Sequence, residues 1–375
     1  MDSIKSQLKT IPGLDKSTWD VVCFGDVARE VKKVSKNPLS EGVECIIGLE
    51  HLAPFDIHIR AWGDVSDGKT FTKRFSKGHV LFGRRRAYQR KAALAVFDGI
   101  CSGDIIVMEA IENKLDPRLL PFLVHGDGFY EWAVSTSAGS LSPRTKFKNL
   151  SEYKFRLPPM EIQKKLAELL WAVDEMEENI LSLVKNENDF YVALIRRLFS
   201  DHLPMKKLVD LAQIIMGQSP PGSSYNTKLG TPFLQGNSEF GDKSPAHVKY
   251  TTQPGRMASV NDILMSVRAP IGAINIADKE YCIGRGLCAV RSDMNDYIKH
   301  ILLYLRPELE RKGTGSTFKA INKGGVQSIL IPFISKKEVV VFSKKLNLVE
   351  NAVTESKNFF QDTRLLRSSI INSIF

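Results

Sequence analysis

Two long stretches of the chain combine a helical pattern of hydrophobic residues with a complete lack of glycine and proline. They cover residues 160–200 and 334–375, and each follows shortly after a proline. Their hydrophobic positions alternate at intervals of four and three residues, which is typical of the a and d positions of a coiled coil. A helix of about 40 residues is roughly 60 Å long, which exceeds the width of an ordinary domain. We therefore predict that the two helices pair. The alternative is that each helix packs on its own domain.

The residues of the two predicted stripes can be read directly from the sequence. The first stripe consists of Ile162, Leu166, Leu169, Val173, Met176, Ile180, Leu183, Phe190 and Leu194. The second consists of Val339, Phe342, Leu346, Val349, Val353, Phe360, Ile370 and Ile374, and is weakened by the polar Ser356, Thr363 and Arg367. We interpret the acidic residues of the first stretch as its solvent-exposed face.

The rest of the chain has the pattern of short strands mixed with a few helices. Runs of β-branched and other apolar residues predict strands at 80–82, 93–97 and 105–108, and again at 263–267, 271–276 and 287–290. Residues 297–305 have the spacing of a helix. The same order of elements occurs in both halves of the chain, so each half is predicted to be α+β.

An internal repeat links these two halves. Residues 23–28 resemble residues 207–212, and residues 78–82 with Arg85 resemble residues 261–265 with Arg268, at offsets of 184 and 183. Residues 139–141 resemble 315–317 at an offset of 176. The constant order predicts two copies of one unit, each a globular domain followed by a long helix. The falling offset predicts about seven extra residues in the first copy, between Cys101 and Gly139.

Two such copies can pack about a pseudo-two-fold axis, which makes their helices antiparallel. The predicted fold class is therefore α+β, with two similar domains separated by two long antiparallel helices that form a coiled-coil spacer. We predict domains at 1–158 and 201–333, a central helix at 159–200 and a C-terminal helix at 334–375. The globular domains are then expected at opposite ends of a rod.

Charge changes this picture because it is unevenly distributed along the chain. The 375 residues carry a formal net charge of +10, yet residues 161–190 contain eight acidic and three basic residues. Residues 68–97 contain nine basic residues and no acidic one. The excess therefore belongs to the globular halves, which favours a polyanionic partner such as nucleic acid. The alternative is a basic surface with no such role.

Motifs for catalysis and for membrane insertion are missing from the sequence. Residues 236–244 imitate a phosphate-binding loop, but Asp242 stands where its lysine is required and Pro245 follows where a helix should begin. Five scattered cysteines and seven dispersed histidines form no recognisable metal-ligand set. No run of eighteen apolar residues and no secretory signal occurs. We expect a cytoplasmic protein that binds no cofactor or metal and has no membrane partner.

Several segments resemble the specificity subunit of type I restriction–modification systems. They are residues 157–165 (LPPMEIQKK), 266–272 (SVRAPIG), 284–286 (GRG) and 317–326 (TFKAINKGGV), and the resemblance covers essentially the whole chain. It implies a non-catalytic binder of double-stranded DNA whose two domains are target-recognition domains. It further implies two modification (methyltransferase) subunits and restriction subunits as partners, with S-adenosylmethionine, ATP and Mg²⁺ bound by those partners.

The two domains are expected to read unlike half-sites of a split, asymmetric target, because Arg84-Arg85-Arg86 stands where the second domain has Val267-Arg268-Ala269. Arginine and amide side chains can read base edges, so the predicted base readers are Arg84, Arg85, Arg86, Gln89, Gln218, Gln235, Asn237 and Arg268. The predicted phosphate contacts are Lys73, Arg74, Lys77, Arg90, Lys91, Thr317, Lys319 and Lys323.

Two readings from other classes of function stay open at this point. The chain can be a helical-rod scaffold that holds two protein-binding domains and has no role with DNA. It can also be a metal-independent nuclease or hydrolase whose site is hidden among the acidic residues. Duplex DNA binding that ignores salt favours the scaffold, and activity of the purified chain alone is needed to support the hydrolase.

Overall fold

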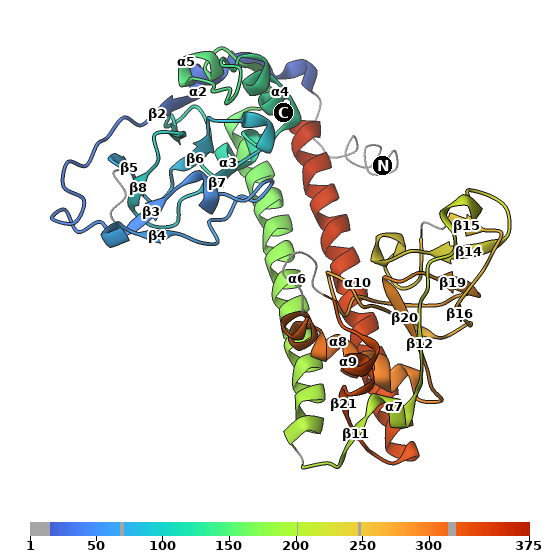
Figure 1. The fold of residues 1–375 in the computed structure, drawn as a ribbon. Coiled ribbons are helices and arrows are strands. Elements are labelled where there is room, and N and C mark those ends of the chain that lie inside the picture. The colour runs from blue at the N-terminus through green and yellow to red at the C-terminus, as the bar shows by residue number, and fades with distance from the viewer. Residues whose placement is uncertain (1–15, 68–70, 201, 247–248, 314–319) are drawn as a thin grey trace. The chain divides into compact units, whose positions relative to one another are not determined.

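The computed structural model describes residues 16–67, 71–200, 202–246, 249–313 and 320–375. These residues form two compact units (Figure 1). The first unit contains the described residues up to Leu181 together with Asn358–Phe375, and the second contains Ser182–Lys357. Each unit therefore takes part of both long helices, and the two units are described separately below.

The two long helices are α6, Met160–Ser200, and α10, Lys336–Ile374 (Figure 1). In the first unit the beginning of α6 packs with the end of α10, where Arg367 Nη1 donates to Asp174 Oδ1 over 2.9 Å. In the second unit the end of α6 meets the beginning of α10, where Ser356 Oγ donates to Glu187 Oε1 over 3.2 Å. The helices pair in the antiparallel sense, as the repeat predicted.

The buried stripe of α6 differs from the predicted one. Leu183 and Phe190 were expected in the stripe, but their exposed fractions are 49% and 55%. Polar side chains are buried instead, so the stripe runs through Gln163, Leu166, Leu170, Val173, Asp174, Glu177 and Ile180. The view that the acidic residues of this helix form its solvent-exposed face is therefore wrong for Asp174 and Glu177. The reason is that α10 supplies the cation that pairs with them, Arg367.

The globular part of the first unit contains three small sheets. Their strand orders are β2(Ala28–Glu30)-β9(Ile105–Ala110)-β6(Val80–Gly83)-β7(Ala92–Leu94), then β4(Gly63–Asp64)-β3(Cys45–Ile47)-β8(Gly99–Cys101)-β5(Lys73–Phe75), and the pair β1(Asp20–Cys23)-β10(Lys154–Leu157). All neighbours are antiparallel except β3 and β8. The helices are α2(Phe24–Val27), α3(Leu120–Leu123), α4(Asp127–Ser135) and α5(Phe147–Leu150), with 3-10 turns η1(Lys16–Thr18), η2(Leu49–His51), η3(Val65–Asp67) and η4(Ala87–Gln89).

The second unit repeats this arrangement with one extra strand. Its sheets are β12(Gln213–Met216)-β20(Leu287–Arg291)-β17(Ile263–Ser266)-β18(Ile274–Ile276), then β13(Tyr225–Asn226)-β15(Lys249–Thr251)-β14(Thr231–Leu234)-β19(Tyr281–Ile283)-β16(Met257–Ala258), and the pair β11(Met205–Lys207)-β21(Leu330–Pro332). Only β14 and β19 are parallel. The helices are α7(Leu208–Leu211), α8(Asn295–Lys312) and α9(Lys323–Gln327), with 3-10 turns η5(Gly222–Ser224) and η6(Asn237–Glu239).

The internal repeat is visible in equivalent backbone hydrogen bonds. Phe24 N donates to Tyr153 O in the first unit, and Leu208 N donates to Ile329 O in the second. The two donors are 184 residues apart and the two acceptors 176, while the equivalent strands β8 and β19 start 182 residues apart. The extra residues of the first copy therefore lie largely after β8, as the falling offset predicted. They fall in a stretch where the first copy has α3 and α4 and the second has α8.

The core of each unit includes both long helices. In the first unit, Leu166 and Leu170 of α6 lie in one cluster with Ile370 and Ile374 of α10 and with buried residues of the sheets. The two helices therefore pair with each other, as predicted, and also pack on the globular domain, which the sequence offered as the alternative. Burial of each such side chain contributes about 1.5–3 kcal/mol.

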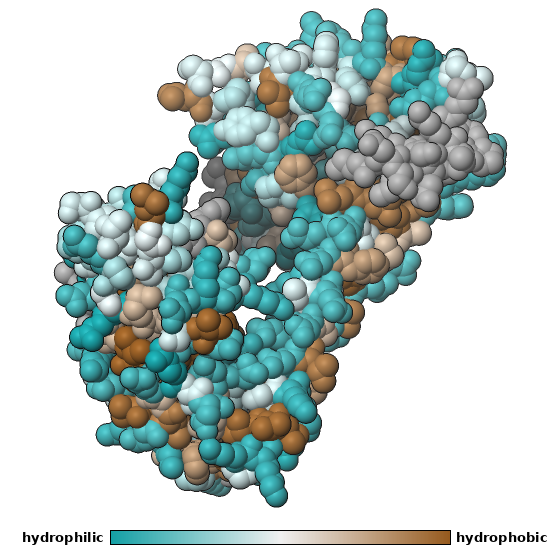
Figure 2. All heavy atoms as spheres, turned by 90° about the vertical axis from the view of Figure 1, so that its right-hand side faces the viewer, coloured by the Kyte–Doolittle hydropathy of each residue, from teal (hydrophilic) through white to brown (hydrophobic). Residues whose placement is uncertain are grey.

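On the face shown in Figure 2, hydrophobic residues occur in separate patches between hydrophilic ones.

Among the described residues, none of the helices is long and apolar enough to cross a membrane.

Candidate nucleic-acid interface

Several of the predicted reading residues of the second unit lie on loops that meet at one tight turn, Gly284–Gly286. Gln218 N donates to Ile283 O over 2.9 Å, and Gly284 N donates to Leu234 O over 2.7 Å. On the other side, Val267 N donates to Gly286 O over 2.9 Å. The segments that carry Gln218, Gln235 and Arg268 are therefore joined through this turn, although they lie up to 50 residues apart in the sequence.

Glycine is required at this junction because the backbones approach too closely for a side chain. A Cβ atom added to Gly217 would lie 2.1 Å from Gly284 O, and one added to Gly286 would lie 2.6 Å from Gln235 O. Real Cβ atoms essentially never make contacts shorter than 3.0 Å. The three loops are consequently held together by main-chain contacts, which leaves their side chains available for an external ligand.

The predicted readers on these loops are largely open to solvent. Gln218, Gln235 and Arg268 are exposed, and Asn237, the first residue of η6, is half-buried. The backbone at Arg268 is fixed, because its carbonyl accepts a hydrogen bond from Ser266 Oγ over 2.6 Å and the residue forms a bridge with Ala320. Their contacts with bases stay a prediction, but the fold does place them on neighbouring loops.

The structure describes one of the three predicted phosphate contacts of the second unit. Lys323 is exposed at the start of α9, whose preceding residue Asn322 accepts a hydrogen bond from Gly325 N over 2.8 Å. Thr317 and Lys319 lie outside the described residues.

The first unit has an equivalent turn, Ser102–Asp104. Unlike Arg268 in the second unit, the arginines near this turn form ion pairs with a carboxylate of the turn. Arg84 N donates to Asp104 O over 2.9 Å, just as Val267 N donates to Gly286 O in the second unit. Arg85 Nη1 lies 3.5 Å from Asp104 Oδ2, and Arg144 Nε lies 2.7 Å from Asp104 Oδ1. The pKa of Asp104 is lowered, chiefly by the hydrogen bond from Arg144. The carboxylate at this turn thus pairs with two partly exposed arginines of its own domain.

The neighbouring arginines also make contacts with the protein. Arg84 Nε donates to Thr145 O over 3.0 Å. Arg86 has a left-handed backbone with φ of 54°, and its buried Nε has no hydrogen-bond partner among the described residues. Gln89 ends the 3-10 turn η4 and is half-buried. The arginine cluster read from the sequence is therefore mostly part of the domain's own polar network, and base reading by it stays a prediction.

The predicted phosphate contacts of the first unit divide in the same way. Lys73 Nζ donates to Ile105 O, Lys91 Nζ donates to Leu49 O, both over 2.7 Å, and Arg74 Nη1 donates to Glu41 Oε2 over 2.8 Å. Lys77 is exposed, and among the described residues its ammonium group has no partner. Lys77 is thus the lysine of this group that is most available for a phosphate.

Arg90 has a structural role. Its guanidinium pairs with Asp127 and lies 5.4 Å from the ring centroids of both Phe55 and Tyr130. Asp127 in turn accepts from Asn372 Nδ2 of α10 over 2.6 Å. Cation–π contacts of a partly buried arginine contribute about 1 kcal/mol each. Arg90 therefore ties the basic loop to the C-terminal helix.

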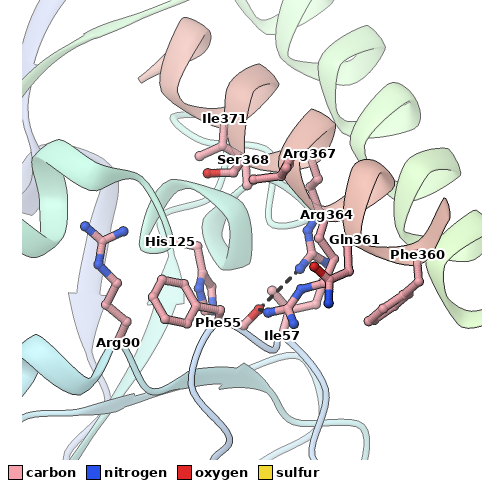
Figure 3. A pocket seen from close by; sticks show the side chains of 11 residues that line it. Phe55, Ile57, Arg90, His125, Phe360, Gln361, Arg364, Arg367, Ser368 and Ile371 are labelled. Carbon is pink, nitrogen blue, oxygen red and sulfur yellow. Dashed lines mark hydrogen bonds between the residues drawn. The ribbon is translucent and has the colours of Figure 1, made fainter. Parts of the chain in front are cut away.

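A pocket of about 400 Å³ lies between this loop and the last turns of α10 (Figure 3). Its arginines are already engaged: Phe55 O accepts from Arg364 Nη2 over 3.3 Å and from Arg367 Nη2 over 3.2 Å. His125 Nε2 lies 2.9 Å from Ala92 O, and burial lowers the pKa of this imidazole to about 4. The side chains that line the pocket thus connect α10 to the domain. Because its arginines already donate to Phe55 O, they are not available to bind an anion.

The polar cluster beside this pocket was missed by sequence reasoning. Asp174 accepts from Arg367 and lies 3.0 Å from His58 Nε2, while Glu178 pairs with Arg60. The hydrogen bond to Asp174 raises the pKa of His58, and burial raises the pKa of Glu177 to about 7. The signal in the sequence was Arg367, a charged residue at a stripe position of the second helix, whereas Asp174 and Glu177 lie next to the predicted stripe of the first. Among the described residues no group of histidine, cysteine or carboxylate side chains is arranged to hold a metal ion.

Comparison with known proteins gives consistent results. The family model "Type I restriction modification DNA specificity domain" matches residues 16–186 and again 203–358. A protein of Methanocaldococcus jannaschii that is named as the MjaX type I restriction enzyme specificity subunit is 30% identical, over 95% of this chain and 90% of the relative. A chain from the structure titled "Structural basis underlying complex assembly and conformational transition of the type I R-M system" matches with a TM-score of 0.63 and 25% identity, over 97% of this chain and 98% of that one. The type I S subunit from M. genitalium shares the fold, with a TM-score of 0.60 and 14% identity over 96% of each chain.

Proposed function

Because this chain belongs to the type I restriction–modification DNA specificity family and gives its complex DNA target specificity, we propose that it reads a split, asymmetric DNA sequence. Each globular domain reads one half-site, and the paired helices set the length of the unread gap between them. The scaffold alternative, with no role in DNA binding, receives no support from the relatives.

The observation that carries the asymmetry is the pair of equivalent turns. The turn Ser102–Asp104 holds Arg85 and Arg144 through the Asp104 carboxylate. The turn Gly284–Gly286 has no acidic residue, and the nearby Arg268 is exposed. Because side chains at equivalent places differ in charge and hydrogen-bonding capacity, the two domains present different patterns to a major groove.

The chemistry of the complex is assigned to other subunits in this proposal. The chain itself is non-catalytic and binds no cofactor. Two modification subunits bind S-adenosylmethionine and methylate adenine, and restriction subunits bind ATP and Mg²⁺ and perform translocation and cleavage. The absence of catalytic motifs from the sequence supports this division of labour, and the protein acts in the cytoplasm, where these subunits meet DNA.

Selection of DNA from a random duplex library by the complex of this chain with its modification subunits tests the proposal. We expect enrichment of two short, unlike sequence blocks separated by a fixed unread gap, with affinity that falls steeply as salt rises. Enrichment of no sequence, together with DNA binding that ignores salt, would overturn the proposal and favour the scaffold. Equal blocks related by two-fold symmetry would overturn its asymmetric part.

A further inference from the structure

One exposed side chain of the second domain, on the candidate nucleic-acid interface, is not among the base readers or phosphate contacts predicted from the sequence. It is Arg285, the central residue of the turn Gly284–Gly286 on which the reading loops meet. We propose that Arg285 is a specificity-determining residue, whose guanidinium reads one base pair of the second half-site. This inference rests on the proposed function and names a reader within it.

The backbone of Arg285 is fixed on both sides. Its own N donates to Ser219 Oγ over 3.2 Å, which ties the turn to the loop of Gln218. Leu287 N donates to Gly284 O over 3.0 Å and closes the turn. A Cβ atom on Gly284 would lie 3.0 Å from Gln235 Cα, so the third loop is packed against the same turn. A side chain that starts from so rigid a base can discriminate between ligands by position, as specific readout requires.

The guanidinium of Arg285 has no bonding partner among the described residues. Within the described ranges, Arg285 has no side-chain hydrogen bond, ion pair or ring contact, and the residue is exposed. The nearby Arg291 gives the contrast, because its Nη2 donates to Asp262 Oδ2 over 2.8 Å and is therefore already paired with a carboxylate of its own domain. Arg285 therefore keeps five N–H donors in a planar fork for an external acceptor.

The first domain shows that the fold does not need an arginine at this place. Ile105 N donates to Ser102 O over 3.0 Å, the equivalent of the bond that closes the second turn. This equivalence puts Gly103 at the position of Arg285. Because glycine has no side chain there, the arginine contributes nothing to the shared fold and is a difference between the two readers. A residue that differs at the point where the reading loops meet is placed to make the half-sites differ.

The chemistry of the side chain indicates which base pair it takes. A guanidinium donates two parallel hydrogen bonds to O6 and N7 of guanine in the major groove, the most frequent specific arginine contact. We therefore expect a G·C pair in the second half-site at the position that depends on Arg285. A phosphate contact, in contrast, needs positive charge alone, which lysine also supplies.

The test uses the assembled complex with its modification subunits and measures methylation of a duplex library in which each position of the wild-type target is varied. The variants are R285A and R285K, and R311A is the control, because Arg311 is exposed at the end of α8 and its side chain bonds, among the described residues, only to Pro307 O. We expect R285A and R285K both to lose discrimination at one G·C position of the second half-site, by roughly tenfold or more. The first half-site and the R311A profile should remain unchanged.

Two results would overturn the inference. One is wild-type discrimination by R285K, which would assign Arg285 to a phosphate. The other is a uniform loss of activity in R285A with no position relaxed. In both cases the wild-type complex still selects its split target, so the proposed function stands. A wild-type complex that selects no target would overturn the proposed function itself, and this inference with it.

Discussion

Arg367 of α10 donates from Nη1 to Asp174 Oδ1 of α6 over 2.9 Å, and both side chains are more than nine-tenths buried. The same Nη1 lies 3.2 Å from Glu177 Oε2. His58 of the first domain reaches Asp174 from the other side. One buried cation thus connects both long helices, and the histidine links them to the domain that precedes them. The spacer and the first domain therefore share one polar core.

Removal of this cation should destabilise the first unit. R367M leaves two buried carboxylates without their cation, which costs about 3–5 kcal/mol in the free energy of unfolding. Urea unfolding followed by tryptophan fluorescence measures this unit selectively, because Trp19, Trp62, Trp132 and Trp171 all belong to it. The control K165M removes an exposed charge from α6 within the same unit. Equal stability of R367M and K165M would contradict a stabilising role for the cluster.

Glu177 should make the stability of this unit depend on pH. Burial raises its pKa from 4.5 to about 7. At pH values between 4.5 and 7 the carboxyl group is therefore ionised in the unfolded chain but still protonated in the folded unit. Its contribution to stability is complete below pH 4.5 and is lost as pH rises through 7. From pH 5 to 8, wild type should lose about 2–3 kcal/mol relative to E177Q.

The matched control for this pH effect is E178Q. Arg60 lowers the pKa of Glu178, so its titration ends below this pH range. The stability difference between wild type and E178Q should therefore stay constant from pH 5 to 8. A constant difference for E177Q as well would show that Glu177 ionises normally in the folded unit.

Arg90 and Gln89 are neighbours for which we expect opposite effects. R90Q breaks the pair with Asp127 and should lower the free energy of unfolding of the first unit by about 1–3 kcal/mol, with the target sequence unchanged. Q89A removes a side chain that has no hydrogen bond within the described residues, so stability should change by less than about 0.5 kcal/mol. If Gln89 reads a base, the first half of the methylated target relaxes at one position in Q89A. A changed target in R90Q would contradict its structural role.

Lys77 should contribute to affinity without contributing to specificity. Its exposed ammonium is free to contact a phosphate, so K77M should weaken binding to specific and random duplexes alike. The slope of log affinity against log salt should become shallower by about one. Fluorescence anisotropy of the assembled complex with DNA at several salt concentrations measures both effects. K337M, which removes an exposed lysine of α10, serves as the control. A K77M slope equal to that of K337M would remove Lys77 from the phosphate contacts.

Much of the architecture could be predicted from the sequence because it follows local periodicity. The lack of glycine and proline predicted both long helices, and the falling repeat offset located the longer connection of the first copy. The composition of the helix interface could not be predicted, because Asp174 meets its partner Arg367 193 residues later in the chain. Hydrophobic spacing treats Arg367 as an interruption of its stripe and places Asp174 on the solvent-exposed face.

The candidate site was predictable to a different degree in the two domains. In the second, Gln218, Gln235 and Arg268 do lie on loops that meet. In the first, the basic run 68–97 contains no acidic residue, yet Glu41, Asp104 and Asp127 reach it from outside and pair with its arginines. Counts of charge along a segment cannot show such partners. Residues 284–286 contribute to the family resemblance, but the sequence does not mark Arg285 as a base reader, because it does not show that the reading loops meet at this turn.

The sequence of methylated sites in the DNA of cells that express this chain with its modification subunits tests the central claim most directly. We predict an interrupted motif whose two halves differ in sequence, with a methylated adenine in each half and a gap of fixed length. A continuous motif, a motif with two equivalent halves, or no new methylated motif in cells that contain the assembled complex would contradict the claim that each domain reads its own half of a split target.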